Sequence, residues 1–86
     1  MKLAFTVSAW EDYLWFQDRD RKLLKRINLI VQDVLRSPFA GIGKPEPLKG
    51  DLSSYWSRRI NDEHRLIYSA TATEVIIIGC RYHYNE

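Results

Sequence analysis

The longest regular pattern of apolar positions in the chain runs from residue 23 to residue 35. Apolar side chains recur there at intervals of three and four residues, at Leu23, Leu24, Ile27, Ile30, Val31, Val34 and Leu35. This spacing gathers them on one stripe of an α-helix, with most charged and amide side chains away from it. Arg36 suits the negative end of the helix dipole, and Ser37 followed by Pro38 ends the helix. The pattern predicts an amphipathic helix that covers an apolar layer.

The segment before this helix predicts a short strand and a first helix. Residues 2–7 alternate weakly between polar and apolar side chains, as a strand does. Ser8 and Glu11 have the spacing of a capping box, which places Ser8 at the N-cap. Helical spacing then continues at Trp10, Tyr13, Leu14 and Trp15. The first helix is expected to end near Asp18, because Asp18 and Asp20 can each cap a new helix.

Residues 37–50 predict an irregular loop, because they hold all three prolines and three of the four glycines. The loop has apolar anchors and is therefore not a solvated linker; they are Phe39, Ile42 and Leu48. Pro45 and Pro47 restrict the backbone on both sides of Glu46. A carboxylate held in this way is a candidate functional group, although the charges of this segment also fit an ordinary solvated loop.

Three further stretches predict strands, at residues 55–60, 63–70 and 74–84. The last opens with four β-branched residues, Val75 to Ile78, which is typical of a strand covered on both faces. Turn-forming residues separate the three strands, so we expect an antiparallel meander with the strand of residues 2–7 alongside. The sequence thus predicts a single α+β domain over residues 1–86. Two N-terminal helices pack on one face of its mostly antiparallel, twisted sheet.

Period-two alternation sorts the side chains of the last two strands between the faces of the sheet. In the strand of residues 63–70, the apolar set expected under the helices is His64, Leu66, Tyr68 and Ala70. In the last strand, the apolar set is Ile76, Ile78, Cys80 and Tyr82. The opposite, open face is expected to carry Arg65, Arg81 and His83. Glu63 on that face would orient the guanidinium of Arg65, and Gly79 would leave a hollow.

An acid, a base and a guanidinium on one face suit the cleavage of RNA without a metal ion. One group removes the 2′-hydroxyl proton, another protonates the leaving 5′-oxygen, and a fixed cation stabilises the phosphorane. A histidine can perform either proton transfer near neutral pH, and a carboxylate can act as the base. Aromatic side chains beside the basic groups could stack on unpaired bases. The predicted open face therefore indicates a candidate ribonuclease site.

Several of these residues also have ordinary structural explanations. His64 is expected to be structural, and a histidine close to a terminus, such as His83, is more often solvated or packed than catalytic. Arg58 and Arg59 must face opposite ways on a strand, so at most one serves a site and the other is expected as surface charge. The three tryptophans fit the core or a subunit contact better than a platform for bases.

Composition narrows the setting in which this chemistry would take place. A hydrophobic share of 45% with 13% aromatic residues is typical of a packed domain and excludes disorder. The net charge of +2 does not by itself indicate a nucleic-acid partner. Cys80 is the single cysteine, which excludes a disulfide framework and a cysteine-based zinc site. Other metal-ligand spacing is absent, so no metal or cofactor is expected.

No stretch of the sequence predicts a membrane span or an export signal. The longest apolar run falls far short of the roughly 20 residues that cross a bilayer, and no signal-peptide pattern is present. We therefore expect a soluble protein of the reducing cytoplasm.

Four segments of the chain, in order, resemble the YoeB-type toxins of the RelE/ParE superfamily. They read FAGIGKPEPLK at residues 39–49, YWSRRI at 55–60, EHRLIY at 63–68 and CRYHY at 80–84. The resemblance implies a microbial-ribonuclease-like α+β fold and a ribosome-dependent endoribonuclease that cuts mRNA in the A site and so inhibits translation. It also implies a homodimer and neutralisation by a YefM-type antitoxin.

Matched position by position, the resemblance implies roles for single residues. Glu46 would be the general base, His83 the general acid and Arg65 the transition-state cation. Supporting site residues are implied at Lys49, Arg59, Glu63 and Tyr84, and the open-face position expected of Arg81 adds it to that set. Strict alternation turns Tyr84 away from His83, so both reach the site only if the strand ends or twists after Tyr82.

Two other functions stay open from the sequence. A non-catalytic module that binds the ribosome or RNA could block translation by occupancy alone. The gyrase-poisoning branch of the same superfamily is the other alternative; its members generally lack the pairing of Glu46 with His83 seen here. The small positive charge suggests weak binding to free RNA and reliance on the ribosome to position the substrate.

Overall fold

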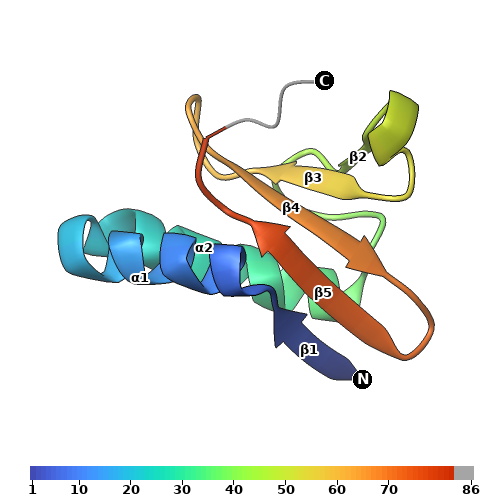
Figure 1. Ribbon diagram of the computed structural model, residues 1–86, viewed down its shortest axis with the longest axis horizontal. Coiled ribbons are helices and arrows are strands. Elements are labelled where there is room, and N and C mark those ends of the chain that lie inside the picture. Colours follow the sequence, from blue (N-terminus) through green and yellow to red (C-terminus); the bar gives the residue numbers. More distant parts are fainter. Residues whose placement is uncertain (83–86) are drawn as a thin grey trace.

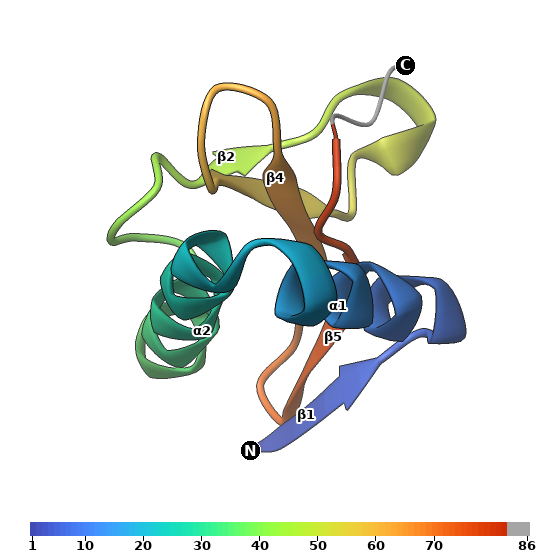
Figure 2. The same ribbon diagram turned by 90° about the vertical axis from the view of Figure 1, so that its left-hand side faces the viewer.

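Two helices cover one face of a five-stranded sheet in the computed structural model, which describes residues 1–82, with Leu52 described by its backbone alone (Figure 1). The elements in chain order are β1 (Lys2–Phe5), α1 (Val7–Arg19), α2 (Arg21–Arg36), β2 (Glu46–Pro47), a 3-10 turn (Gly50–Leu52), β3 (Trp56–Arg59), β4 (Arg65–Ala70) and β5 (Glu74–Gly79). The strand order is β1-β5-β4-β3-β2, with β1 parallel to β5 and the other pairs antiparallel. Figure 2 shows both helices on the same side of the sheet. The predicted α+β architecture is confirmed.

The first helix begins one residue before the predicted N-cap. Thr6 caps it, since its Oγ1 accepts a hydrogen bond from the Ala9 amide at 3.1 Å. The Thr6 amide also donates to the Ile77 carbonyl at 3.0 Å, which holds Thr6 in the extended conformation that an N-cap needs. β1 therefore passes straight into α1, and Ser8 lies in the first turn. The prediction of Ser8 as the cap was wrong.

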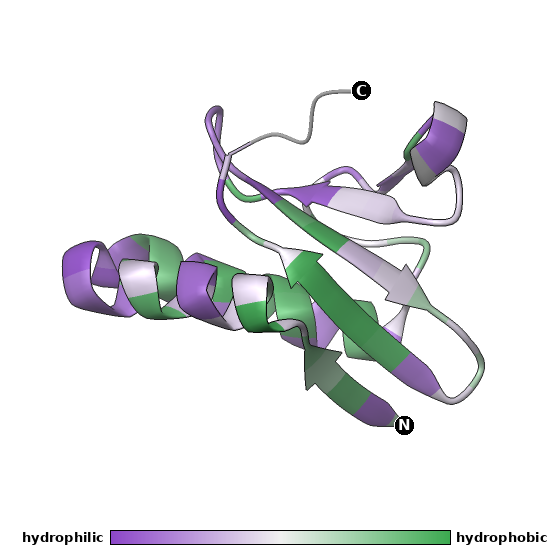
Figure 3. Cartoon of the chain, viewed as in Figure 1, coloured by the Kyte–Doolittle hydropathy of each residue, from purple (hydrophilic) through white to green (hydrophobic). Residues whose placement is uncertain are grey.

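Asp20 joins the two helices and was correctly identified as a cap. Its amide donates to the Phe16 carbonyl at the end of α1, and its Oδ1 accepts from the Leu23 amide at 3.1 Å at the start of α2. The buried side chains of α2 all belong to the predicted stripe, and they pack with residues of α1, β4 and β5 in one core. That core comprises Ala9, Phe16, Ile27, Ile30, Val31, Val34, Ile60, Leu66, Tyr68, Val75, Ile77 and Cys80. Figure 3 shows β5 as hydrophobic along its middle, with a hydrophilic residue where the strand begins.

A β-bulge in β5 changes which of its side chains enter the core. Ile67 pairs with Gly79 while Tyr68 pairs with Ile77, which leaves Ile78 as an extra residue on β5. Val75 and Ile77 are fully buried in the core, whereas Ile76 and Ile78 are only half-buried. The prediction that Ile76 and Ile78 share the core face with Cys80 was therefore wrong, because alternation cannot be counted across the bulge.

The C-terminal part of that prediction also fails, because β5 ends at Gly79. Tyr82 was placed on the core face, but 47% of its surface is exposed. His83 and Tyr84 lie outside the described residues.

The loop between α2 and β3 is more ordered than predicted. Glu46 and Pro47 form β2, paired with Ser57 and Trp56 of β3. β2 is an edge strand, where a proline costs no hydrogen bond of the sheet. The clustered prolines and glycines thus did not prevent a short strand, and Glu46 lies on the sheet instead of in an irregular loop. Within residues 1–82 no helix has the length and apolar character needed to cross a membrane.

Candidate active site

The strand register gathers Glu46, Arg59 and Arg65 on the face of the sheet opposite the helices, which we call the site face. Directly paired residues share a face, and the pairs Glu46 with Ser57, Ser57 with Ile67, and Arg59 with Arg65 connect the three charged positions. From the strand spacing, the Cα atoms of Glu46 and Arg65 lie roughly 12 Å apart, two strand spacings across the sheet and two residues along it. Long side chains can therefore reach one phosphodiester from both positions.

The site face has a buried centre and a charged rim. Ser57 and Ile67, at the centre, are 7% and 1% exposed. Glu46 and Arg59 are exposed and Arg65 is half-buried. A ligand on this face would meet these charged side chains first.

Close packing of the loop before β2 fixes the position of Glu46. The Arg59 amide donates to the Gly43 carbonyl at 2.6 Å. Gly43 has φ +80°, and a Cβ at this position would lie 3.0 Å from the Arg59 carbonyl oxygen. Only glycine meets both conditions without strain. The loop is thereby held against the end of β3 three residues before Glu46.

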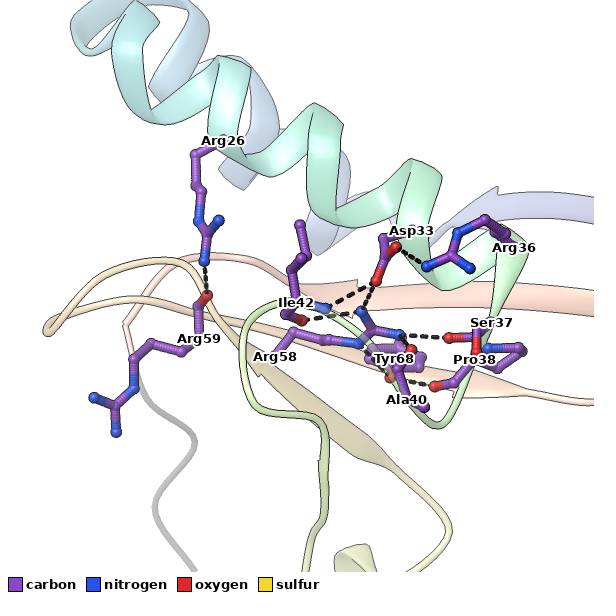
Figure 4. Close-up of polar contacts among 10 residues, drawn as sticks. All are labelled: Arg26, Asp33, Arg36, Ser37, Pro38, Ala40, Ile42, Arg58, Arg59 and Tyr68. Carbon is purple, nitrogen blue, oxygen red and sulfur yellow. Dashed lines mark hydrogen bonds and ion pairs between the residues drawn. The ribbon is translucent and has the colours of Figure 1, made fainter.

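Arg58 organises the rest of this loop from the helix-covered face (Figure 4). The side chain is 0% exposed, and its guanidinium uses all five N–H donors. Nη1 donates to Asp33 Oδ2 at 2.6 Å and to a carbonyl oxygen, Nη2 donates to two carbonyl oxygens, and Nε donates to the Tyr68 hydroxyl at 3.1 Å. The three carbonyl groups belong to the loop, at Ser37, Ala40 and Ile42. Three carbonyl groups of the loop therefore surround the Arg58 guanidinium.

The carboxylate that pairs with Arg58 lies in an unusually favourable setting. Hydrogen bonds from Arg36, Arg58 and the Ile42 amide hold the pKa of Asp33 well below its usual range. The Tyr68 hydroxyl donates in turn to the Pro38 carbonyl at 2.6 Å, and burial raises the pKa of Tyr68. Asp33 is therefore negatively charged and Tyr68 neutral at any pH near neutrality.

The buried cluster of Arg58 and its partners was not predicted from the sequence. The prediction that Arg58 and Arg59 face opposite ways is confirmed, but the arginine away from the site was expected at the surface and is instead fully buried. The burial of Arg58 could have been predicted from alternation, because Arg58 points to the same face of the sheet as Trp56. Its pairing partner is the core residue Leu66. Figure 4 shows Arg59 pointing away from the cluster.

Arg65 is tied to the turn that precedes β4. Its Nη1 donates to the carbonyl oxygens of Asn61, at 2.9 Å, and His64, at 3.2 Å. The expected pairing with Glu63 is not found, because Glu63 lies in the turn before β4, where alternation does not apply. The Glu63 carboxylate lies 3.6 Å from His64 Nε2 instead. The carbonyl groups of the turn thus take over the orienting role that was predicted for Glu63.

The charges of the site face have no ion-pair partners in the part of the chain that the structure describes. The pairs found there are Arg36 with Asp33, Arg58 with Asp33, and His64 with Glu63. None of them involves Glu46, Arg59, Arg65 or the exposed Lys49, which stands just before the 3-10 turn. Within residues 1–82, one carboxylate and three cations are therefore not engaged in ion pairs.

Arg81 does not lie on the site face, contrary to the prediction. Its guanidinium lies 3.9 Å from the ring centroid of Trp15 on α1, and Nη2 donates to the Tyr82 hydroxyl at 3.2 Å. β5 has already ended at Gly79, so alternation cannot be extended to Arg81. The cation stacks on the helix side of the molecule.

Cys80 is a fully buried free cysteine. Its amide donates to Asp12 Oδ2 at 3.2 Å, and its thiol approaches the Ala9 carbonyl. Burial, with a smaller effect of Asp12, raises the pKa of the thiol to about 12. Burial also raises the pKa of Asp12.

His64 is structural, as expected. It is 4% exposed, and its Nδ1 accepts a hydrogen bond from the Tyr82 amide at 2.7 Å. The chain therefore approaches Arg65 again at its C-terminal end. Both His83 and Tyr84, which were predicted to complete the site, come after the last described residue.

A separate apolar groove of about 400 Å³ lies between β1 and the two helices, away from the site face. It is lined by Leu3, Phe5, Trp10, Tyr13, Asn28, Val31, Gln32 and Leu35. It offers no charged side chain for acid–base chemistry. Among residues 1–82, no three histidine, cysteine or carboxylate side chains gather closely enough to hold a metal ion.

Comparisons with known proteins agree on one family. The sequence model for the YoeB-like toxin of bacterial type II toxin-antitoxin systems matches residues 5–84. Toxin YoeB of Synechocystis is 63% identical over all of both chains. The solved YoeB/ParE toxin from Agrobacterium tumefaciens superposes with a TM-score of 0.94 at 48% identity, covering 98% of this chain and 100% of the other.

Two solved structures from Staphylococcus aureus are similar as well. One is a YoeB dimer, with a TM-score of 0.91, and the other a heterotetrameric YoeB-YefM toxin-antitoxin complex, with a TM-score of 0.89. Each is 45% identical and covers 98% of both chains.

Proposed function

This chain belongs to the YoeB-like toxins of bacterial type II toxin-antitoxin systems, and on that premise we propose that it is a ribosome-dependent endoribonuclease that cuts mRNA in the A site. The observation that carries the proposal is the common placement of Glu46, Arg59 and Arg65 on one face of the sheet. All three side chains lack an ion-pair partner among residues 1–82, so their charges are available to RNA.

The proposed reaction is an internal transesterification. Glu46 takes the proton of a ribose 2′-hydroxyl, and the 2′-oxygen forms a bond to the adjacent phosphorus. The bond from phosphorus to the 5′-oxygen breaks, and that oxygen receives a proton from His83. The products are a 2′,3′-cyclic phosphate and a 5′-hydroxyl end. Arg65 stabilises the extra negative charge of the phosphorane between these steps.

The geometry of Arg65 supports its role as the fixed cation. Two carbonyl oxygens of the preceding turn hold Nη1, so the guanidinium has a defined orientation before a substrate arrives. A donor that is already oriented needs no reorganisation when charge develops on the phosphorane. Lys49 and Arg59 would bind flanking phosphates, with Glu63 and Tyr84 as further supporting residues.

The ribosome would supply what this small site lacks. Affinity for free RNA increases with the number of phosphates that cations neutralise. Three cations near the site and a net charge of +2 support only weak binding to free RNA. Positioning of mRNA by the small subunit would compensate, in the cytoplasm where translation takes place.

We further propose that the chain forms a homodimer and is neutralised by a YefM-type antitoxin. The similarity to a YoeB dimer and to a YoeB-YefM complex supports both assignments. Co-purification with the antitoxin, followed by loss of mRNA cleavage in the complex, would test the second.

Primer extension on mRNA in translating ribosomes tests the proposed function. The wild-type chain is expected to produce discrete new 5′ ends, and the variant with Glu46→Ala and His83→Ala none. Glu11→Ala is the matched control, because Glu11 is exposed on α1 and remote from the site face. Equal arrest of translation by both proteins without new ends would instead identify a non-catalytic inhibitor that binds the ribosome or RNA.

A further inference from the structure

The site face continues beyond its charged residues into a row of half-buried side chains without charge. Strand pairing arranges the face in rows that cross the sheet. Arg59 and Arg65 form the first row, and Glu46 lies in the second with Ser57. The third row lies two residues further along the strands and consists of Leu48, Tyr55, Ser69 and Ile76. Uncharged surface therefore lies directly beside the carboxylate that is proposed as the general base.

Tyr55 precedes β3, and strand geometry places it in this third row. Its carbonyl accepts a hydrogen bond from the Leu48 amide at 2.9 Å, which extends the pairing of β2 with β3 by one residue. Trp56, the next residue, packs against the core on the side of the sheet that both helices cover (Figure 2). Because successive side chains of a strand point to opposite faces, Tyr55 belongs to the site face.

The spacing along this face matches the parts of a nucleotide. Tyr55, Ser57 and Arg59 are alternate residues of one strand, so each Cα atom lies about 7 Å from the next. Glu46 pairs with Ser57, the middle residue, and the strand spacing puts the Cα atoms of Glu46 and Tyr55 roughly 8 Å apart. The order along the face is thus an aromatic ring, a small side chain opposite a carboxylate, and a cation. A nucleotide presents its base, its ribose and its phosphate in the same order.

Tyr55 differs from the other aromatic side chains that the structure describes. Each of the others contacts a second ring or a guanidinium. The hydroxyl groups of Tyr13, Tyr68 and Tyr82 each take part in a hydrogen bond. Within residues 1–82, the half-buried Tyr55 has neither a ring contact of this kind nor a hydrogen bond at its hydroxyl. Its ring is therefore not used by the described part of the fold for stacking.

We propose that Tyr55 is a substrate-binding residue that stacks on a base of the mRNA, namely the base of the nucleotide whose 2′-hydroxyl is deprotonated by Glu46. This inference rests on the proposed function, in which Glu46 is the general base. Single-stranded RNA is commonly bound by such stacking, which accepts any base because every base has a π-face. Leu48 and Ile76 add apolar surface to the same row. With the base on Tyr55, the ribose lies at Glu46 and the scissile phosphate toward Arg65.

Two substitutions separate the ring of Tyr55 from its volume. Tyr55→Leu keeps a large apolar side chain but has no ring, and Tyr55→Phe keeps the ring and loses only the hydroxyl. We expect Tyr55→Leu to lower kcat/KM on ribosome-bound mRNA by about tenfold, the loss of one stack between a base and an aromatic ring. Tyr55→Phe should recover activity to within about threefold of the wild type. A leucine variant as active as the phenylalanine variant would overturn the inference.

An abasic nucleotide in the mRNA tests the same contact with an unchanged protein. It retains the 2′-hydroxyl and the phosphates but has no base to stack. Placed immediately 5′ of the cut, it should lower kcat/KM of the wild type by about tenfold and that of Tyr55→Leu by less than about twofold, because the variant has already lost the contact. The matched control has the abasic nucleotide immediately 3′ of the cut and should affect both proteins equally. Equal losses from the 5′ position in both proteins would show that Tyr55 does not bind that base.

Glu46→Ala, measured in parallel, distinguishes failure of the inference from failure of the proposed function. If Glu46→Ala is inactive while Tyr55→Leu is fully active, the nuclease assignment stands and the stacking role is wrong. If Glu46→Ala cuts mRNA normally, the assignment of the general base is wrong, and the stacking role is rejected with it. Weaker binding of the YefM-type antitoxin by Tyr55→Leu with unchanged cleavage would identify a protein-binding surface and also overturn the inference. Circular dichroism defines a temperature at which each variant is folded, and all rates are measured there.

Discussion

Arg58 and Arg59 are adjacent on β3, yet the two faces of the sheet give them opposite roles. Arg58 lies under the helices, is 0% exposed and donates all five of its guanidinium hydrogen bonds within the protein. Arg59 lies on the site face, is exposed, and takes part in no ion pair within residues 1–82. The difference shows that residue type alone does not identify a substrate-binding cation. Its donors must also be available to a ligand.

The buried arginine still matters to the site, through the loop that it organises. Removing a guanidinium from water costs several kcal/mol, which Asp33 and four further acceptors offset. Three of those acceptors are carbonyl groups of the loop that leads to Glu46. Contacts on the helix-covered face thus help to fix the loop that leads to a residue on the other face.

Removing Arg58 should have the largest effect on stability. Arg58→Met keeps much of the side-chain volume but leaves Asp33 without its buried partner and three loop carbonyls without donors. We expect the free energy of unfolding to fall by about 3 to 5 kcal/mol, the usual consequence of breaking a buried ion pair. Urea denaturation followed by circular dichroism measures it. Arg59→Met is the matched control and should change stability by less than about 0.5 kcal/mol. Equal losses in both variants would contradict the comparison.

The second largest effect on stability is expected at Gly43, where the loop contacts β3, and Gly50 is its matched control. Gly43 and Gly50 have similar positive φ angles, +80° and +68°. A Cβ on Gly43 would meet the Arg59 carbonyl oxygen at 3.0 Å, whereas a Cβ on Gly50 meets nothing within 4 Å. Both alanine variants incur the backbone cost of about 1 kcal/mol, and Gly43→Ala adds a steric cost of similar size.

Activity should separate the two variants further. Gly43→Ala pushes the loop away from β3 and displaces Glu46, so cleavage of ribosome-bound mRNA should fall by about tenfold, while Gly50→Ala stays close to wild type. Gly43→Ala with unchanged cleavage would mean that Glu46 is not positioned by this contact.

Acid pH should weaken the helix-covered cluster through Asp33. Its pKa in the folded protein is lowered, mainly by hydrogen bonds from Arg36 and Arg58, so the unfolded chain binds more protons than the folded one at low pH. The stabilisation is complete above the unfolded pKa of about 4 and is lost as pH falls below it. Asp33→Asn should therefore show a shallower decline of the unfolding temperature between about pH 4 and pH 2. Identical pH profiles would contradict this role.

The fold could be predicted because its signals are local and regular. The spacing of Leu23 to Leu35 needs only the period of a helix, and Ser37 with Pro38 ends that helix as expected. Short turns between three strands leave few arrangements other than a meander. Asp20 was identifiable as a cap, whereas Thr6 was not, because the extended conformation of Thr6 depends on a hydrogen bond from its amide to the carbonyl of Ile77, 71 residues away in the chain.

The site could be predicted only where strands stay regular. Strand pairing places Arg59 and Arg65 together on the open face, where alternation had predicted Arg65. The bulge at Ile78 and the end of β5 at Gly79 invalidate the same counting for Ile76 and Arg81. The loop carbonyl groups and Asp33 that bind Arg58 lie 16 to 25 residues away from it in the chain. No local sequence pattern indicates such contacts.

The smallest effect, and the sharpest test of the comparison, is expected for the charge of Arg59. Arg59→Gln removes one exposed cation from the site face, and Arg21→Gln removes one from the exposed start of α2. If Arg59 contacts a phosphate, its variant should bind RNA a few-fold more weakly, with a salt dependence of log K reduced by about 1. Arg21→Gln has the same net charge and should keep the wild-type slope. Binding to a short single-stranded RNA at several salt concentrations gives both slopes. Equal slopes in the two variants would mean that Arg59 contributes only to the overall charge, and that an unpaired cation on this face is not sufficient evidence of a phosphate contact.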